Sequence, residues 1–409
     1  MGHKKNNSPI DKDVFFILNL VEKHGYEARV VGGAVRDFIA RRKISDVDIA
    51  TTALPVEIID IFRRGGLTTS PISLEHGTVS VRRRNKFYEV TTLRSDVKTF
   101  GRRAEVKFCK SFEMDSCRRD FTINALSMDK EGKIYDYHSG IEDILSQKIR
   151  FIGDAKERIR EDYLRILRYF RFTAAYGNYK CNSDYLAVIS ALKNNIKILS
   201  GERIISELLK IFEIPDSHRI VPPMLEILNE LFSLKFDATD ACVKLNIFES
   251  LSNAEKLSML LKFSGEEDLL RRYNFPRNIR EMILLKQVDH AQAFTKLKQI
   301  KKAHRIFYAK FLVVDSYLNH KYSATDAKSL LKELLEFCRS EYIDFRFSPD
   351  ELKEFRLTNE EVKSLMIATK RFWLMNQTAS PRQCREFARK YADVFLKKHP
   401  RSTKEWGKE

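Results

Sequence analysis

The chain has 409 residues, of which 43% are hydrophobic, and a formal net charge of +17 with an isoelectric point near 9.4. This length and hydrophobic content exclude wholesale disorder and predict roughly two to four structural units. A balance this basic favours a polyanionic partner, of which nucleic acid is the commonest. A basic surface that serves only solubility would carry the same charge.

The six cysteines form no Cys-x-x-Cys pair and the nine histidines do not cluster, which argues against a structural zinc site. Buried thiols in a reducing compartment are the simpler interpretation. The polar N-terminus, Met1 to Asp13, has no apolar signal core. No apolar run approaches the ~18 residues of a membrane span. We therefore expect a soluble cytoplasmic protein that needs no zinc and no membrane.

The first part of the chain is expected to contain a sheet. Twelve of the fifteen glycines fall at or before Gly177, and sheets need many turns. Alternating and β-rich patterns predict strands at residues 27–31, 45–50, 78–82 and 87–92, the last two as a hairpin. A helix is predicted at 55–64. Strands with flanking helices indicate an α/β layer.

Beyond residue 149 the pattern becomes helical. Residues 154–173 have apolar side chains at helical spacing, with acidic residues early and arginines late, which predicts one long amphipathic helix. Further helices are predicted at 201–212, 223–234, 254–262, 279–288, 291–312, 325–341 and 359–372. The tail from Ser380 is rich in Lys and Arg, and either a solvated basic face or an RNA contact would explain it.

Three segments carry the candidate chemistry, and the first is a glycine turn. Val31 leads into Gly32-Gly33 and then into a helix that contains Arg36. Such a turn lets backbone amides approach a triphosphate, and the helix N-terminus favours an anion. Arg36, one turn into the helix, can reach the same phosphates. The turn is neither a Walker A loop nor a dinucleotide fingerprint, so alone it is weak evidence.

The second segment is Asp46-Val47-Asp48, ten residues after Arg36. Alternate residues of a strand point to the same face, so the two carboxylates should converge, about 7 Å apart along the strand. Like charges on one face are unfavourable unless a cation joins them. Magnesium suits hard oxygen ligands and nucleotide phosphates. We therefore predict Asp46 and Asp48 as catalytic metal ligands for two-ion nucleotidyl transfer.

The third segment spans residues 161–171. Asp162, Arg165, Arg168 and Arg171 recur every three residues and are expected on one stripe of the long helix. Ordinary helix ion pairs, such as Glu161 with Arg165, account for part of this pattern. Three arginines beside large apolar residues are more than solubility needs.

Together with Arg118-Arg119-Asp120-Phe121-Thr122-Ile123-Asn124-Ala125-Leu126, these segments occur in the order found in class II tRNA nucleotidyltransferases. The chain thus resembles the CCA-adding enzymes, in a superfamily shared with bacterial poly(A) polymerase. The resemblance covers roughly residues 28–175, and the helical remainder is similar only in general character. It implies an α/β nucleotidyltransferase (polymerase-beta-like) head with a mixed sheet at 1–150, an all-α neck at 151–220, and a helical body and tail at 221–409 that bind tRNA.

The resemblance also implies residue roles. Asp46 and Asp48 would hold Mg²⁺; Gly33, Arg36 and Arg119 would contact phosphates or ribose; Asp162 and Arg165 would pair with the base edge; Arg168 and Arg171 would support the nucleotide. One carboxylate and one guanidinium complement both cytosine and adenine, whereas guanine and uracil leave a buried mismatch of roughly 1–3 kcal/mol. The implied reaction adds C, C and A to the tRNA 3′ end from CTP and ATP and releases pyrophosphate.

Other segments bear on the choice within the superfamily. Residues 75–79 followed by 89–94 resemble the CCA-adding branch, and the basic Gly-Arg-Arg-Phe-like segment of poly(A) polymerases does not follow the aspartates. Residues 94–103 resemble the mobile loop that lets CCA-adding enzymes switch from C to A, and a plain surface loop is the other interpretation. Glu89 is a candidate third carboxylate. Poly(A) polymerase, a partial CC- or A-adding enzyme and a non-catalytic RNA-binding protein stay open as alternatives.

Overall fold

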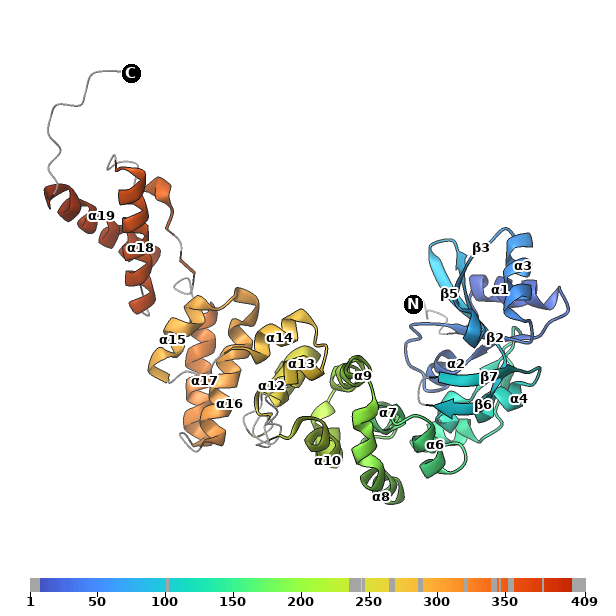
Figure 1. Ribbon diagram of the computed structural model, residues 1–409. Coiled ribbons are helices and arrows are strands. Elements are labelled where there is room, and N and C mark those ends of the chain that lie inside the picture. Colours follow the sequence, from blue (N-terminus) through green and yellow to red (C-terminus); the bar gives the residue numbers. More distant parts are fainter. Residues whose placement is uncertain are drawn as a thin grey trace, which may run out of the picture. The chain divides into compact units, whose positions relative to one another are not determined.

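The computed structural model describes residues 8–100, 103–234, 244, 247–264, 269–285, 290–319, 323–339, 344–345, 347–351, 357–376 and 379–398. Two compact units divide the chain. The first comprises Met1–Ser233 with Glu266–Asn274, and the second Leu234–Gly265 with Phe275–Glu409. Figure 1 shows that the sheet belongs to the first unit. Among the described residues, none of the helices combines the length and apolarity that a membrane crossing requires.

The head is built on a mixed sheet, as predicted, which has seven strands within the described residues. Their order across the sheet is β3-β4-β5-β2-β1-β8-β9, and only β2 and β5 pair in parallel. The strands are β1 (Ala28–Val31), β2 (Asp48–Thr51), β3 (Thr68–Ser73), β4 (Thr78–Arg83), β5 (Lys86–Thr92), β8 (Ser127–Met128) and β9 (Ile134–Tyr135). The predicted hairpin at 78–92 is confirmed as the antiparallel pair β4 and β5.

The two faces of this sheet differ in polarity because strand residues alternate between them. One face carries a fully buried row that runs across four strands through Val30, Ile49, Val90 and Val79. Helices α1 (Lys12–Glu22) and α3 (Pro55–Arg64) contact the sheet and bury their own apolar residues. The next row of the register points the other way and contains Asp48 beside Glu89. The sheet thus presents two neighbouring carboxylates opposite its apolar core.

The turn after β1 determines where β2 begins. Gly32 has a φ of 68°, and helix α2 (Gly33–Ile39) starts directly after it. Val31 is therefore the last residue of β1 and pairs with Asp48, the first residue of β2. Residues 45–47 have no strand partner, so the predicted strand at 45–50 is wrong at its start. Asp46 precedes the strand instead of lying on it.

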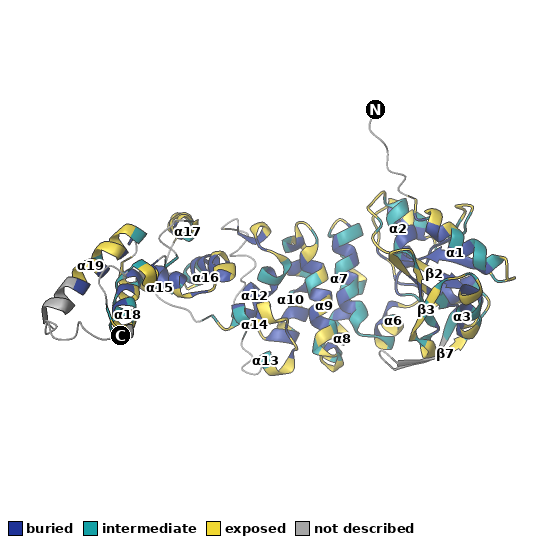
Figure 2. Cartoon of the chain, turned by 90° about the horizontal axis from the view of Figure 1, so that it is seen from above, coloured by how far each residue is buried: buried dark blue, intermediate teal, exposed yellow. Residues whose placement is uncertain are grey.

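The rest of the first unit is mainly helical. Its helices are α4 (Phe112–Cys117), α5 (Gly140–Leu145), α6 (Ala155–Glu161), α7 (Leu164–Tyr176), α8 (Ser183–Leu192), α9 (Gly201–Glu213), α10 (Val221–Phe232) and α13 (Leu269–Arg272), with 3-10 turns η1 (Leu74–His76), η2 (Thr122–Asn124), η3 (Lys193–Ile198) and η4 (Ser217–Ile220). Figure 2 shows buried residues along α7, α9 and α10. Apolar packing of these helices gives α7 a rigid support.

The long helix predicted at residues 154–173 is wrong, because the segment forms two helices, α6 and α7. The break falls at Asp162, whose backbone is extended at φ −154° and ψ 107°. Its carboxylate accepts a hydrogen bond from the Leu164 amide at 3.1 Å. Asp side chains that bond to nearby backbone amides compete with helix continuation and start a new helix. Asp162 therefore lies at the bend between two helices, and not on one helical stripe with Arg165, Arg168 and Arg171 as expected.

The second unit is helical in its described parts. Its helices are η5 (Phe248–Ser250), α12 (Asn253–Lys262), α14 (Arg277–Ile283), α15 (His290–Gln299), η6 (Lys302–His304), α16 (Arg305–Leu318), α17 (Ala324–Arg339), α18 (Asn359–Met375) and α19 (Pro381–Lys398). The helix predicted at 291–312 is wrong, because it divides into α15, η6 and α16. The basic tail from Ser380 contains α19, and its residues 399–409 lie outside the described part.

The segment at residues 94–103 also differs from the expected loop. Its backbone forms β6 (Arg94–Phe100), which pairs with β7 (Arg103–Phe108) as a separate two-stranded sheet in the described residues. Residues 101–102 and the side chains of 96–106 lie outside the described part. The predicted role in switching between C and A stays a prediction, as does the division into head, neck and body with tail.

Candidate active site

A cavity of about 520 Å³ lies in the first unit against the polar face of the sheet. Its walls come from the β1–α2 turn, β2, β5, the segment 115–124, and the α6–α7 bend with α7. The cavity brings together every predicted site residue except Asp46: Gly33, Arg36, Asp48, Arg119, Asp162, Arg165, Arg168 and Arg171. Residues that are up to 138 positions apart in the chain thus meet in one place.

Asp48 and Glu89 form the acidic side of this cavity. They are register partners on the parallel strands β2 and β5, and both line the cavity. Removal from water raises the pKa of Asp48, and the neighbouring Glu89 raises it further, while Arg119 acts in the opposite direction. Within the described residues, neither carboxylate has an ion pair with Lys or Arg. The donor set is two hard oxygen ligands whose charge Arg119 compensates only in part, which fits a divalent cation.

Asp46 lies just outside the cavity lining. It is exposed, and its carboxylate accepts a hydrogen bond from the Ser45 hydroxyl at 3.1 Å. Its charge still contributes to the raised pKa of Asp48, so the two carboxylates are electrostatically coupled. The predicted role of Asp46 as a metal ligand stays a prediction. Glu89, named from the sequence only as a candidate third carboxylate, is the residue that lies directly beside Asp48.

Arg119 reaches the cavity behind the glycine turn. Its guanidinium donates to the Asn124 carbonyl at 3.2 Å and pairs with Asp115 at 3.2 Å. Burial lowers the pKa of Arg119, although Asp115 counteracts this. A Cβ on Gly32 would lie 2.9 Å from the Arg119 guanidinium. The positive φ favours glycine at position 32, and a Cβ there would have to displace the Arg119 guanidinium.

Arg36 is held on two sides. It donates to the Asn124 side chain at 2.6 Å and pairs with Asp37 at 2.9 Å. Its guanidinium also lies 4.5 Å from the centre of the Tyr176 ring. These contacts fix the guanidinium at the cavity wall, one turn into α2, where the sequence placed it.

Asp115, Asp120 and Asn124 are functional neighbours that the sequence analysis did not assign. Asp120 accepts hydrogen bonds from Arg168 at 2.6 Å and from Asn124 at 3.0 Å. Burial acts to raise the pKa of Asp120, but Arg168 outweighs this and the pKa lies below its ordinary value. Asp120 and Asn124 both stand in the motif quoted from the sequence, and their presence in that motif was the available signal for a role at the site.

Arg165 is oriented by three acceptors. It pairs with Glu161 at 2.5 Å, as the sequence suggested, and donates to the backbone carbonyls of Arg158 at 2.9 Å and Arg118 at 3.2 Å. A guanidinium has five N–H donors, so Nε and one Nη2 hydrogen are left for a ligand. The side chain is 11% exposed. Arg165 is thus a rigid donor at the cavity wall.

Asp162 and Arg171 have partners on α9. The Asp162 carboxylate lies 2.7 Å from the Arg203 guanidinium, and Arg171 lies 3.0 Å from the buried Glu207 carboxylate. Burial lowers the pKa of Arg171, against the effect of Glu207. A carboxylate has about four lone-pair sites. Asp162 uses one for Arg203 and one for the Leu164 amide, so it can still accept from a ligand.

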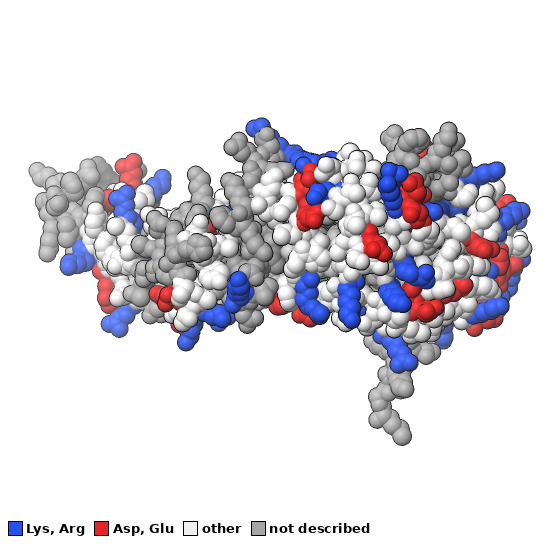
Figure 3. All heavy atoms as spheres, turned by 90° about the horizontal axis from the view of Figure 1, so that it is seen from below, with Lys and Arg blue, Asp and Glu red and all other residues white. Residues whose placement is uncertain are grey.

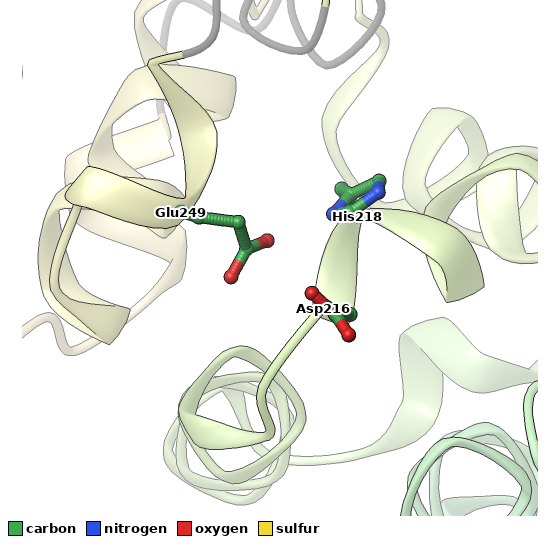
Figure 4. A group of neighbouring side chains, drawn as sticks. All are labelled: Asp216, His218 and Glu249. Carbon is green, nitrogen blue, oxygen red and sulfur yellow. The ribbon is translucent and has the colours of Figure 1, made fainter.

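A further group of metal-ligand residue types is drawn in Figure 4. It consists of Asp216 and His218 around the start of η4, and Glu249 on η5. The first two residues belong to the first unit and Glu249 belongs to the second. We assign no metal site to residues of two different units.

The fold and the cavity define a class of protein. A mixed sheet presents paired carboxylates at a cavity lined by arginines, with a glycine turn at its edge, which is the arrangement of a nucleotidyltransferase head. Residues 28–150 match the family described as "Poly A polymerase head domain".

Curated relatives narrow the class. The chain is 44% identical over 199 residues to "CCA tRNA nucleotidyltransferase 1, mitochondrial" of Mus musculus, which covers 48% of this chain and 46% of the relative. It is 43% identical over 199 residues to a CCA-adding enzyme of Staphylococcus haemolyticus, covering 48% of each chain. The matched stretch thus spans about half the length of these curated relatives.

A solved structure extends the similarity along the chain. The Bacillus stearothermophilus CCA-adding enzyme in complex with CTP matches with a TM-score of 0.68 and 26% identity, covering 95% of this chain and 99% of that chain. These findings confirm the resemblance to class II CCA-adding enzymes and the predicted fold, a mixed-sheet head followed by helices.

Proposed function

We propose that the protein is a CCA-adding tRNA nucleotidyltransferase that extends the 3′ end of tRNA by C, C and A, using CTP, ATP and Mg²⁺. The observation that carries this proposal is a single cavity that contains both the chemical pair Asp48 and Glu89 and the base-reading pair Asp162 and Arg165. A site for phosphoryl chemistry alone needs the first pair only. The second pair, rigidly held, gives the same site a means to choose the base.

The carboxylates are proposed to hold Mg²⁺, with Asp48 and Asp46 as ligands and Glu89 as their neighbour. When bound, Mg²⁺ would assist deprotonation of the tRNA 3′-hydroxyl and stabilise charge on the leaving pyrophosphate. The sheet positions Asp48 and Glu89 side by side before any nucleotide enters. Their position on adjacent strands, rather than on a loop, favours the precision that in-line attack requires.

Arg36 and Arg119, which also line the cavity, are proposed to bind the triphosphate. Arg36 and Arg119 flank the glycine turn, where backbone amides at the start of α2 face the same space. Asn124 bonds to both guanidinium groups, so their relative position is fixed. Charge stabilisation by donors that do not need to reorganise is usually the largest contribution to catalysis.

Nucleotide choice is proposed to reside at the α6–α7 bend. Asp162 can accept the exocyclic amino group of cytosine or adenine, while the Arg165 hydrogens left over can donate to the neighbouring ring acceptor. Uracil and guanine present a carbonyl oxygen where Asp162 needs a donor, and an unpaired polar contact of this kind costs roughly 1–3 kcal/mol. Arg168, held by Asp120, and Arg171 are proposed to support the bound nucleotide.

The decisive experiment supplies the protein with tRNA that lacks CCA and with CTP and ATP, separately and together, followed by product sequencing. We expect CC from CTP alone and CCA from the mixture. Long A tails on any RNA would identify a poly(A) polymerase instead, and a product that stops after CC, or A added only to tRNA ending in CC, would identify a partial enzyme. No incorporation with intact RNA binding would identify an RNA-binding protein. A cytoplasmic location stays a prediction, tested by cell fractionation.

A further inference from the structure

Helix α9 stands behind two residues of the cavity wall. Arg203 and Glu207 are four residues apart on this helix and therefore lie on the same side of it. Nη2 of Arg203 contacts Oδ2 of Asp162 at 2.7 Å, and Nη1 of Arg171 contacts Oε1 of Glu207 at 3.0 Å. Asp162 and Arg171 line the cavity, whereas Arg203 and Glu207 do not. Helix α9 thus holds one acidic and one basic side chain of the cavity, because Arg203 pairs with Asp162 and Glu207 pairs with Arg171.

Asp162 depends on this support because its own backbone does not fix it. It caps α6 with an extended backbone, outside the hydrogen-bonded helix. Its carboxylate is fixed at one oxygen by the Leu164 amide and at the other by Arg203. Arg165, three residues later, pairs with Glu161 instead. Among the described residues, Arg203 is the cation that forms an ion pair with Asp162.

We propose that Arg203 is a positioning residue for nucleotide selection, which holds the Asp162 carboxylate in the orientation that accepts the amino group of cytosine or adenine. This inference rests on the proposed function, since it takes Asp162 as the acceptor for the base. With both oxygens engaged, the carboxylate cannot rotate away from a wrong base. A carbonyl oxygen of uracil or guanine therefore lies against a fixed negative charge, and the unfavourable contact cannot be relieved by movement of the carboxylate.

Removal of Arg203 would release one of the two anchors of Asp162. The carboxylate could then turn away from uracil at little cost, because the other anchor that the described residues provide is a single backbone amide. The values of kcat/KM for correct and incorrect nucleotides would consequently become more similar. The ratio between them reports the orientation of Asp162, whereas a general loss of stability lowers both rates together.

Glu207 offers a matched control on the same helix. Its partner Arg171 is proposed to support the nucleotide and does not contact the base edge. We expect Glu207→Gln to weaken CTP and UTP use to a similar extent. A difference between the ratios of Arg203 and Glu207 variants therefore separates base reading from damage to α9.

The experiment measures kcat/KM for CTP and UTP with tRNA lacking CCA, together with the equilibrium affinities of both nucleotides, in the full-length protein. For Arg203→Met, which keeps the length of the side chain, we expect the CTP-to-UTP ratio to fall by about tenfold or more, in line with the cost of one buried mismatch. Arg203→Lys, which keeps the charge, should recover most of the ratio.

A folded Arg203→Met or Arg203→Gln variant with the parent ratio would overturn the proposal. So would failure of every neutral variant to fold while Arg203→Lys keeps both fold and ratio, because the role would then be stability alone. Failure of the proposed function would give a different experimental result. The parent protein would then incorporate neither CTP nor ATP, and the binding ratios would still show whether Arg203 controls the preference for cytosine.

Discussion

Within the described residues, Asp48 and Glu89 are adjacent carboxylates without the arginine ion pairs that Asp115 and Asp120 form. Asp115 pairs with Arg118 and Arg119, and Asp120 pairs with Arg168. Burial acts to raise the pKa of Asp115, but the two arginines keep it below its ordinary value, whereas the pKa of Asp48 is raised. Within the described residues Asp48 has no ion pair with Lys or Arg, and Arg119 offsets the rise in its pKa only in part, so a bound cation is expected to supply further positive charge.

Replacement of Asp48 by Asn should abolish nucleotide incorporation. The amide keeps the shape of the side chain but removes the negative charge that would hold the metal, at a loss of roughly 4 kcal/mol or about 10³-fold in rate. Rates are measured with tRNA lacking CCA, and tRNA affinity is measured in parallel and should be unchanged. Asp60→Asn, on the exposed side of α3, is the matched control with parent activity. Activity within tenfold of the parent for Asp48→Asn would contradict the metal assignment.

Asp46 gives a second test at this scale. It precedes the strand and lies outside the cavity lining, yet its charge acts on Asp48. If it is a metal ligand, Asp46→Ala should abolish incorporation as fully as Asp48→Asn and leave tRNA affinity intact. A loss of only a few fold, seen in single-turnover rates, would show that Asp48 and Glu89 suffice.

At the scale of elements, the β1–α2 turn depends on Gly32. Gly32 and Gly66 both have positive φ, but a Cβ would meet the Arg119 guanidinium only at position 32, and nothing within 4 Å at position 66. Alanine at either position should lower the free energy of unfolding by about 1–3 kcal/mol through backbone strain. Only Gly32→Ala should also raise the KM for CTP, by roughly tenfold, because it displaces Arg119. Equal KM values for the two variants would disprove this role of the turn.

The elements show which features a sequence can predict. Four strands of the head were predictable because period-2 patterns and turn residues are local signals, whereas β3, β8 and β9 were not predicted. Gly33, Arg36 and Asp48 were found from their spacing. The break at Asp162 was missed because a spacing of three residues is the same whether position 162 ends one helix or lies inside a longer one. Arg203 and Glu207 were missed because their partners lie 41 and 36 residues away, and no local pattern reports such pairs.

A buried lysine makes the second unit pH-sensitive. Burial lowers the pKa of Lys262 on α12 to about 8, and its Nζ donates to the backbone carbonyl of Ile283. Between pH 8 and 10.5 the unfolded chain binds this proton and the folded chain does not, so Lys262 by itself should contribute a rise in stability of about 1.4 kcal/mol per pH unit. Urea unfolding followed by tryptophan fluorescence suits this test, since Trp373 and Trp406 belong to this unit.

The comparison with Lys262→Met isolates that effect. The variant should lack the contribution of Lys262 and keep that of Lys298, whose pKa burial also lowers to about 8, so its stability relative to the parent should fall by about 2 kcal/mol between pH 8 and 9.5. Lys370→Met, at an exposed position on α18, should follow the parent at every pH. A constant difference between Lys262→Met and the parent would show that Lys262 keeps its proton in the folded state.

For the whole molecule, the net charge of +17 is the dominant electrostatic feature. On the face drawn in Figure 3, Lys and Arg side chains are interspersed with Asp and Glu and do not form one uniform patch. Binding of a folded RNA would then rest on many separate phosphate contacts. Each such contact releases counterions, so the number of contacts can be read from the salt dependence of binding.

Affinity for tRNA lacking CCA should therefore fall steeply with salt. About six phosphate contacts would weaken binding by roughly 10³-fold between 50 and 200 mM KCl. The exposed Arg389 and Lys390 on α19 test whether the tail takes part. Arg389→Gln with Lys390→Gln should reduce the log–log slope by about one to two, whereas the same charge loss at the exposed Lys12 and Lys23 at the two ends of α1 should leave it unchanged. Equal slopes for both double variants would assign the basic tail to solvation and leave RNA binding to other parts of the chain.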